Sequence, residues 1–179
     1  PGAAAAWSAL ARIRSRQNRL DEAEEALRTA LDLSPQNTND TYRQLGWLCL
    51  ATQRPAEAVA AFSAAAGNNP HDAESLLGLA EASRAAEKLP QALQTIRKVL
   101  NLRSDWPAAR TVLGHILAAS GPAFWDEAVL ELTKALAQQP AQGETRRLLA
   151  DVLHRLGRSD DALKVLVDGL VLTPAVADL

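Results

Sequence analysis

The fold is decided by the stretch at residues 79–99, which reads LAEASRAAEKLPQALQTIRKV. Its apolar and small side chains return at intervals of three and four, the spacing of two amphipathic helices joined by a short turn. Pro90 stands at the first turn of the second helix, where its missing N–H does no harm. Related stretches recur with a period near 34 residues, clearest in the spacing of Pro35, Pro70, Pro140 and Pro174. The chain is therefore predicted to be an array of paired helices.

Five units account for the chain, at residues 4–37, 39–72, 73–106, 107–142 and 143–176. First helices are expected near 4–17, 40–53, 73–86, 107–120 and 143–156, and second helices near 21–33, 55–67, 89–102, 124–138 and 159–172. The twentieth position of a unit is always alanine, at Ala23, Ala58, Ala92, Ala128 and Ala162. Because a larger side chain would overpack a helix crossing there, these alanines predict a close approach of the two helices.

Other positions of the unit keep the same phase. The seventh is large, at Leu10, Leu45, Leu79, Leu113 and Leu149, and so is the 24th, at Leu27, Phe62, Ile96, Leu132 and Leu166. The eighth is small, at Ala11, Gly46, Ala80, Gly114 and Ala150. The helix ends are marked as well: Gly121 and Gly157 stand where first helices should stop, and Asp72 and Asn39 stand where they can cap the next unit.

Composition excludes several classes of protein. The 36 alanines and 29 leucines favour helices and disfavour an all-β fold. A formal net charge of −2 argues against a nucleic-acid partner, and no apolar run is long enough to span a membrane. The chain contains no methionine, even at position 1, so we expect a fragment of a longer protein. No signal peptide is visible; the compartment stays open, with the cytoplasm favoured.

The spacing resembles the tetratricopeptide repeat, a 34-residue helix–turn–helix unit with the pattern W-x₂-L-G-x₂-Y…A-x₃-F…P. The residues that carry the resemblance are Trp7, Leu10, Leu45-Gly46, Leu113-Gly114, Ala58, Phe62 and the four prolines. Departures occur at the eleventh position, where Arg14, Cys49, Ser83, Leu117 and Leu153 replace tyrosine, and at the fourth, where Arg110 and Arg146 replace an aromatic residue. The resemblance implies an all-α, right-handed superhelical solenoid of about five repeats, forming a single array over 1–179.

The resemblance also implies that the first helix of each unit lines a concave groove, with its second, fifth, ninth, twelfth and thirteenth positions facing inward. The candidate groove residues are Arg12, Arg16, Arg43, Trp47, Glu81, Arg84, His115, Arg147, Asp151 and Arg155. Family members that clamp the C-terminal carboxylate of a chaperone use lysine and asparagine at the fifth and ninth positions. None of the five pairs in this chain fits, so no such clamp is expected.

Arginine is suited to bidentate recognition of carboxylates, and Trp47 could add a flat anchor. One hypothesis is therefore that the N-terminal half holds a segment with acidic side chains and one apolar anchor. The alternative is that Asp40, Glu74 and Glu81 pair with the arginines and leave an ordinary solvated face. Trp47 itself could equally be packed between neighbouring repeats.

Two further surfaces stand out. Phe124 and Trp125 lie in the insertion at residues 122–125, at a helix–helix turn, where they either fold back on the repeat or form a contact tip. The last helix is very apolar from Val165 to Leu172, although terminal repeats need a polar outer face. Either more repeats follow, or this surface pairs with another copy.

Signals of catalysis are lacking. No phosphate-binding glycine loop or metal-binding histidine pair occurs, and Cys49 is expected to be a buried, inert thiol. We therefore expect a non-enzymatic scaffold without a cofactor that binds a peptide or protein segment. The alternatives are a substrate-recruiting, non-catalytic arm of a larger enzyme, such as a glycosyltransferase, and a self-assembly module.

Overall fold

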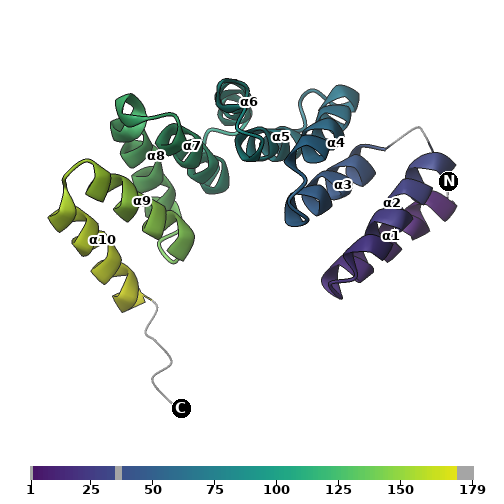
Figure 1. The fold of residues 1–179 in the computed structure, drawn as a ribbon, viewed down its shortest axis with the longest axis horizontal. Coiled ribbons are helices and arrows are strands. Elements are labelled where there is room, and N and C mark those ends of the chain that lie inside the picture. Colours follow the sequence, from purple (N-terminus) through teal and green to yellow (C-terminus); the bar gives the residue numbers. More distant parts are fainter. Residues whose placement is uncertain (1, 35–37, 173–179) are drawn as a thin grey trace, which may run out of the picture. The chain divides into compact units, whose positions relative to one another are not determined.

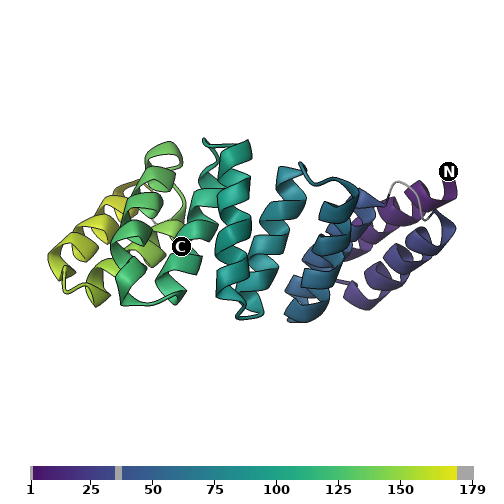
Figure 2. The same cartoon turned by 90° about the horizontal axis from the view of Figure 1, so that it is seen from above.

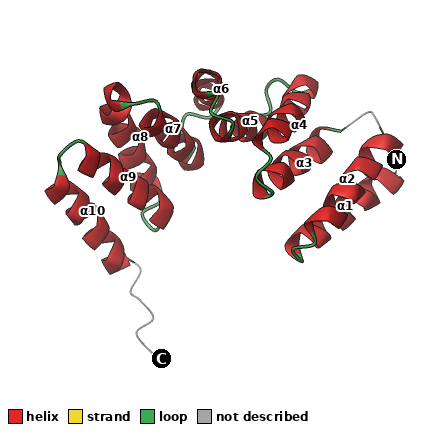
Figure 3. Cartoon of the chain, viewed as in Figure 1, coloured by secondary structure: helices red, strands yellow, loops and turns green. Residues whose placement is uncertain are grey.

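A computed structural model of the chain describes residues 2–34 and 38–172. In this part of the chain there are ten α-helices and no strand (Figures 1 and 3). The helices are α1 (Gly2–Arg16), α2 (Leu20–Leu33), α3 (Asn39–Ala51), α4 (Pro55–Asn68), α5 (Ala73–Ala85), α6 (Leu89–Leu102), α7 (Pro107–Ala119), α8 (Trp125–Gln138), α9 (Gly143–Arg155) and α10 (Ser159–Leu172). The predicted all-α class and the order of first and second helices are confirmed. The observed helix ends differ from the predicted ends by no more than two residues.

The helices fall into two compact units, which divide within α6 between Thr95 and Ile96. In the first unit α1 packs on α2 and α3 on α4, and α4 also packs on α5 (Figure 2). In the second unit α7 packs on α8 and α9 on α10, and α8 packs on α9. Two of the four phase-marking prolines, Pro35 and Pro174, lie outside the described residues. That the repeats form one array over the whole chain stays a prediction.

The predicted tight crossings are present in both units. The alanines at the twentieth position are 0% exposed at 23, 58, 92 and 128 and 6% exposed at 162. At the eighth position, a Cβ added to Gly46 would lie 2.6 Å from the Phe62 ring, and one added to Gly114 would lie 2.4 Å from Leu132. The Phe62 and Leu132 side chains can pack directly on the neighbouring helix because these glycines carry no side chain.

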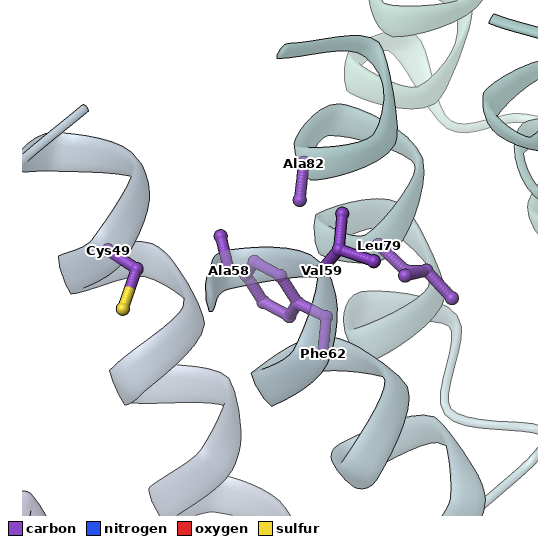
Figure 4. Close-up of a cluster of buried hydrophobic side chains, with 6 residues drawn as sticks. All are labelled: Cys49, Ala58, Val59, Phe62, Leu79 and Ala82. Carbon is purple, nitrogen blue, oxygen red and sulfur yellow. The ribbon is translucent and has the colours of Figure 1, made fainter. Parts of the chain in front are cut away.

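Phe62 on α4 fills the centre of the first unit. Its side chain is 0% exposed and packs with Cys49 of α3 and Leu79 of α5 (Figure 4). The ring also lies against two glycines, because a Cβ added to Gly78 would be 2.2 Å from it, closer still than at Gly46. A single aromatic side chain therefore joins three helices of two consecutive repeats.

Four of the five first helices end in one left-handed residue that is hydrogen-bonded as a Schellman motif. After α9, Gly157 has φ +76°, its N–H donates to His154, and the N–H of Arg158 donates to Leu153. The predicted stops at Gly157 and at Gly121, with φ +111°, are confirmed. The corresponding residues in the first three repeats are not glycines but Asn18, Gln53 and Glu87.

Replacing Gly157 with alanine is expected to lower the free energy of unfolding by about 1 kcal/mol, because its φ is costly for a residue with a Cβ. Gly67→Ala is the matched control. Gly67 is helical and a Cβ there meets nothing within 4 Å, so alanine should raise stability by about 0.5 kcal/mol. Urea unfolding of both variants gives the comparison. Equal effects of the two substitutions would contradict this account of the turn.

Only one of the two predicted caps is correct. Asp72 is the N-cap residue of α5, and its side chain accepts a hydrogen bond from the backbone N–H of Glu74. Asn39 is not a cap, because α3 begins at Asn39 itself and Thr38 takes the cap position. The Asn39 side chain instead donates to the Asp72 carboxylate at 3.0 Å and so links α3 to the residue that caps α5.

The arginines that replace the aromatic residue at the fourth position tie helices together. Arg110 on α7 pairs with the carboxylate of Glu131 on α8 and donates to the carbonyl oxygen of Ser104. Arg146 on α9 donates to the carbonyl oxygens of Val165 at 2.8 Å and of Pro140 at 2.6 Å. A guanidinium at this position therefore supplies polar bonds between the two helices of its repeat.

Acidic groups in ion pairs make the fold sensitive to acid. Hydrogen bonds from Arg54 and Arg28 hold the pKa of Glu24 below its ordinary value of 4.5, although burial raises it. Burial also raises the pKa of Glu131, but its hydrogen bonds from Lys134 and Arg110 outweigh that effect, so the pKa is lowered. A depressed folded pKa stabilises the folded state above the ordinary pKa, and this stability is lost as the pH falls through the folded value.

We expect the free energy of unfolding to decline as the pH drops below about 4.5. In Glu24→Gln the decline should be shallower, and stability at pH 7 should be lower by about 1–2 kcal/mol because charge-assisted hydrogen bonds are lost. Glu144→Gln is the control, because the Glu144 side chain is 73% exposed. Thermal unfolding over a pH series measures how steeply the stability of each variant falls with pH. A Glu24→Gln profile parallel to the unsubstituted one would contradict the assignment.

Candidate functional site

In the first unit, the inward positions of the first helices surround a hollow. This α1–α3 hollow has a volume of about 350 Å³ and is lined by Arg12, Ser15, Arg16, Leu20, Gln44, Trp47, Leu48 and Ala51. Three predicted groove residues, Arg12, Arg16 and Trp47, are thus brought together. Leu48 and Ala51 add apolar surface, so the hollow offers two cations beside an apolar wall.

A second hollow of about 330 Å³ has Arg12 as a shared wall. It is lined by Ala4, Ala5, Ser8, Arg12, Ala30, Ser34, Asp40 and Thr41. The hydroxyl groups of Ser8 and Thr41 are 3.0 Å apart and link α1 to α3. Because both hollows lie between the same two helices, they extend the candidate surface along the length of α1.

Trp47 is the largest exposed apolar side chain of this surface. It is 43% exposed and meets Phe62 edge to face, with ring centroids 5.1 Å apart and an interplanar angle of 78°. One side of the indole is thus fixed by the core while another part stays open to the α1–α3 hollow. Of the two placements considered from the sequence, the structure shows Trp47 neither wholly buried between repeats nor free of the core.

The arginines differ in how they are neutralised. Arg43 lies 2.7 Å from Asp40 and 2.8 Å from Glu74, and Arg84 lies 2.6 Å from Glu81. For Arg43 and Arg84 the structure therefore shows the intramolecular pairing that was the alternative to ligand recognition. This pairing also includes Glu81, which was a candidate groove residue in its own right.

Arg12 and Arg16, in contrast, have no acidic partner among the described residues. Both are exposed, and neither forms an ion pair with any residue in 2–34 or 38–171. A guanidinium group has five N–H donors and no acceptor. The α1–α3 hollow is therefore lined by two arginines whose donors are not used in ion pairs with described residues.

The second unit has a hollow of its own between α9 and α10. It measures about 420 Å³ and is lined by Arg147, Ala150, Asp151, His154, Ser159, Ala162, Leu163 and Leu166. Asp151 is paired with Arg155 at 2.8 Å, whereas Arg147 has no ion pair with a described residue. His115 lies 3.7 Å from Glu144 and is not part of this lining.

The insertion at the turn before α8 folds back on the repeat. Pro122–Phe124 form a short 3₁₀ helix, and both Phe124 and Trp125 are half-buried. The Trp125 indole N–H donates to the carbonyl oxygen of Ala118 at 3.2 Å, which satisfies an acceptor at the end of α7. This placement is the first of the two alternatives, and that Phe124 and Trp125 form an edge contact stays a prediction.

Three models of the tetratricopeptide repeat match the sequence, at residues 2–66, 50–116 and 112–174. Together they cover every residue that the structure describes. The chain belongs to the tetratricopeptide repeat family. Tetratricopeptide repeats characteristically act in protein–protein interaction, so the coarse prediction of an interaction scaffold is supported.

Similar proteins agree on the fold. A chain titled MamA 41-end from Desulfovibrio magneticus RS-1 superposes with a TM-score of 0.84 at 14% identity, covering 99% of each chain. YrrB, titled a TPR protein with an unusual peptide-binding site, gives 0.70 at 20% identity, covering 95% of this chain and 86% of its own. DnaJ homolog subfamily C member 3 of Bos taurus is 31% identical over 122 residues, which are 68% of this chain and 23% of that protein. The chain spans less than a quarter of the length of the curated relatives it matches.

The part of this tetratricopeptide repeat chain that the structure describes contains neither a metal-binding cluster nor a helix that could span a membrane. No group of three or more His, Cys, Asp or Glu side chains there could hold a metal ion. Cys49 is 1% exposed, and burial raises the pKa of its thiol, which disfavours the reactive thiolate. Among the described residues, the helices are all too short or too polar to cross a bilayer.

Sequence reasoning missed several side chains that line the hollows. Leu20 and Gln44 belong to the α1–α3 hollow, and Ser159 and Leu163 belong to the hollow of the second unit. The family register gives only the inward positions of first helices, whereas three of these four side chains come from second helices. None of the four carried a signal in the sequence, because the apolar run noted in the last helix begins only at Val165.

Proposed function

We propose that the chain is a scaffold that binds a protein segment along α1 and α3, with an acidic side chain of the ligand beside Arg12 and Arg16 and an apolar one beside Trp47. The observation that carries the proposal is the α1–α3 hollow, where two cations with unused donors lie next to an exposed indole. Interface hot spots are enriched in these two residue types. YrrB, a protein of similar fold, is described as a TPR protein with an unusual peptide-binding site.

The charge arrangement supports an acidic rather than a basic ligand. Arg12 and Arg16 can each donate two parallel hydrogen bonds to a carboxylate, the geometry at which arginine is strongest. The carboxylates of Asp40 and Glu81 are already occupied by Arg43 and Arg84, so they offer little to a basic segment. An acidic ligand would therefore gain ion pairs without breaking existing ones.

A peptide-display selection tests the proposal. The chain is used as bait, and the selected peptides are measured against Trp47→Ala and against the double variant Arg12→Ala/Arg16→Ala. The proposal expects enriched peptides with Asp or Glu near Leu, Ile or Phe, and at least about a tenfold loss of affinity in both variants.

The matched controls lie on second helices. Leu130→Ala removes an apolar side chain that is 53% exposed, and Arg97→Ala removes an arginine that is 56% exposed. Both should leave the affinity unchanged. Selected peptides that bind Trp47→Ala and Arg12→Ala/Arg16→Ala as tightly as the unsubstituted chain would overturn the proposal.

A further inference from the structure

Consecutive repeats of the first unit meet through the same two positions of the unit. The 24th residue of one repeat packs with the tenth residue of the next. Leu27 of α2 packs with Leu48 of α3, and Phe62 of α4 packs with Ala82 of α5. These four side chains are between 0% and 5% exposed. The interface between repeats therefore has one half on a second helix and the other half on the following first helix.

Both halves of this interface also occur in exposed form. The tenth residue of the first repeat is Ile13 on α1, which is 54% exposed, and the 24th residue of the fifth repeat is Leu166 on α10, which is 41% exposed. Further exposed apolar side chains of α10 surround Leu166: Leu163, Val167, Leu170 and Val171. The α1 half is small and centred on one isoleucine, and the α10 half is broad.

The charges of the two helices are opposite. Helix α1 carries Arg12, Arg14 and Arg16 and no acidic residue. Helix α10 carries three aspartates, Asp160, Asp161 and Asp168, and one lysine. Opposite net charges favour contact between α1 and α10, whereas two copies of α10 would repel each other.

We propose that the exposed face of α10, centred on Leu166, binds α1 of a second copy of this chain, with Ile13 packing against Leu166 as Leu48 packs against Leu27. The two faces are different, so the contact is head-to-tail, and each bound copy presents a new α10 face for the next. The proposal does not depend on peptide binding in the α1–α3 hollow, because Ile13 is not part of its lining.

Sedimentation velocity of the chain over a concentration series tests the proposal. The expected result is a mass that rises from monomer to dimer and beyond, with weaker association at high salt because the attraction between α1 and α10 is screened. Ile13→Glu and Leu166→Glu should each be monomeric alone, since each lacks one half of the interface. An equimolar mixture of the two should form a dimer and grow no further, because only one intact pair of faces remains.

Several results would overturn the head-to-tail contact: a monomeric unsubstituted chain at every concentration, a mixture of variants that stays monomeric, or an Ile13→Glu variant that still dimerises, which would mean that α10 pairs with itself. Leu170→Glu, at a side chain 67% exposed, repeats the α10 test at a site that bears less on folding. Circular dichroism checks that each variant is folded. Leu130→Glu, on α8 and 53% exposed, is the control that should associate normally.

Discussion

Phe62→Ala is expected to lower the free energy of unfolding by about 3–5 kcal/mol, the range for removing a large buried aromatic side chain. The Phe62 ring is 0% exposed and lies between α3 and α5, against Gly46, Gly78 and the edge of Trp47. Its neighbours are held by helix backbones, so they cannot close the cavity that alanine would leave. The loss should therefore lie at the upper end for a single substitution.

Urea unfolding followed by circular dichroism measures the loss, and hydrogen exchange localises it. Because contacts in repeat proteins are between neighbours, the fall in protection should be greatest in α3, α4 and α5. Leu130→Ala removes a side chain that is 53% exposed and should change stability by less than about 0.5 kcal/mol. A Phe62→Ala loss as small as that of the control would show that Phe62 does not join the helices as described.

Gly78→Ala carries the second largest expected effect, a loss of about 1–3 kcal/mol from overpacking. The new Cβ would lie 2.2 Å from the Phe62 ring, which is already wedged between α3 and α5. Alanine is a better helix former than glycine by about 1 kcal/mol, and the steric conflict must exceed that gain. Gly67→Ala measures the gain in helix propensity alone, because a Cβ added at Gly67 meets no atom within 4 Å.

A double-mutant cycle makes the test specific. In a Phe62→Leu background the shorter side chain leaves room at Gly78, so Gly78→Ala should cost less there than in the unsubstituted chain, by about 1 kcal/mol or more. Thermal or urea unfolding of the four proteins gives the coupling energy. Additive effects of the two substitutions would mean that Gly78 is not small on account of Phe62.

Much of the fold is predictable because it depends on residue size at a fixed phase. Ala23, Ala58 and Ala92 share one position and are all 0% exposed, since any larger side chain would separate the helices. The turns were less predictable. Gly157 marks its turn by being the residue that tolerates positive φ, whereas Gln53 and Glu87 adopt the same conformation without any such signal.

The candidate site was predictable in position but not in charge state. The register places Arg12 and Arg43 at inward positions of first helices, and Arg12 lines the α1–α3 hollow. Which arginine is neutralised depends on side-chain geometry across repeats: Arg43 reaches Glu74 of the next repeat at 2.8 Å. Arg12 meets no described acid at ion-pair distance. Such pairing is set by rotamers and by the spacing of helices, which the order of residues does not show.

The indole N–H resonances of the four tryptophans provide the most direct test of ligand binding at the α1–α3 hollow. A ¹⁵N-labelled chain is titrated with a selected acidic peptide, and the four signals are assigned by substitution. Binding along α1 and α3 predicts that the Trp47 signal moves in a saturable way, while Trp125, whose indole donates to Ala118, stays in place. A saturable shift of the Trp125 signal on α8, with an unmoved Trp47 signal, would contradict the account.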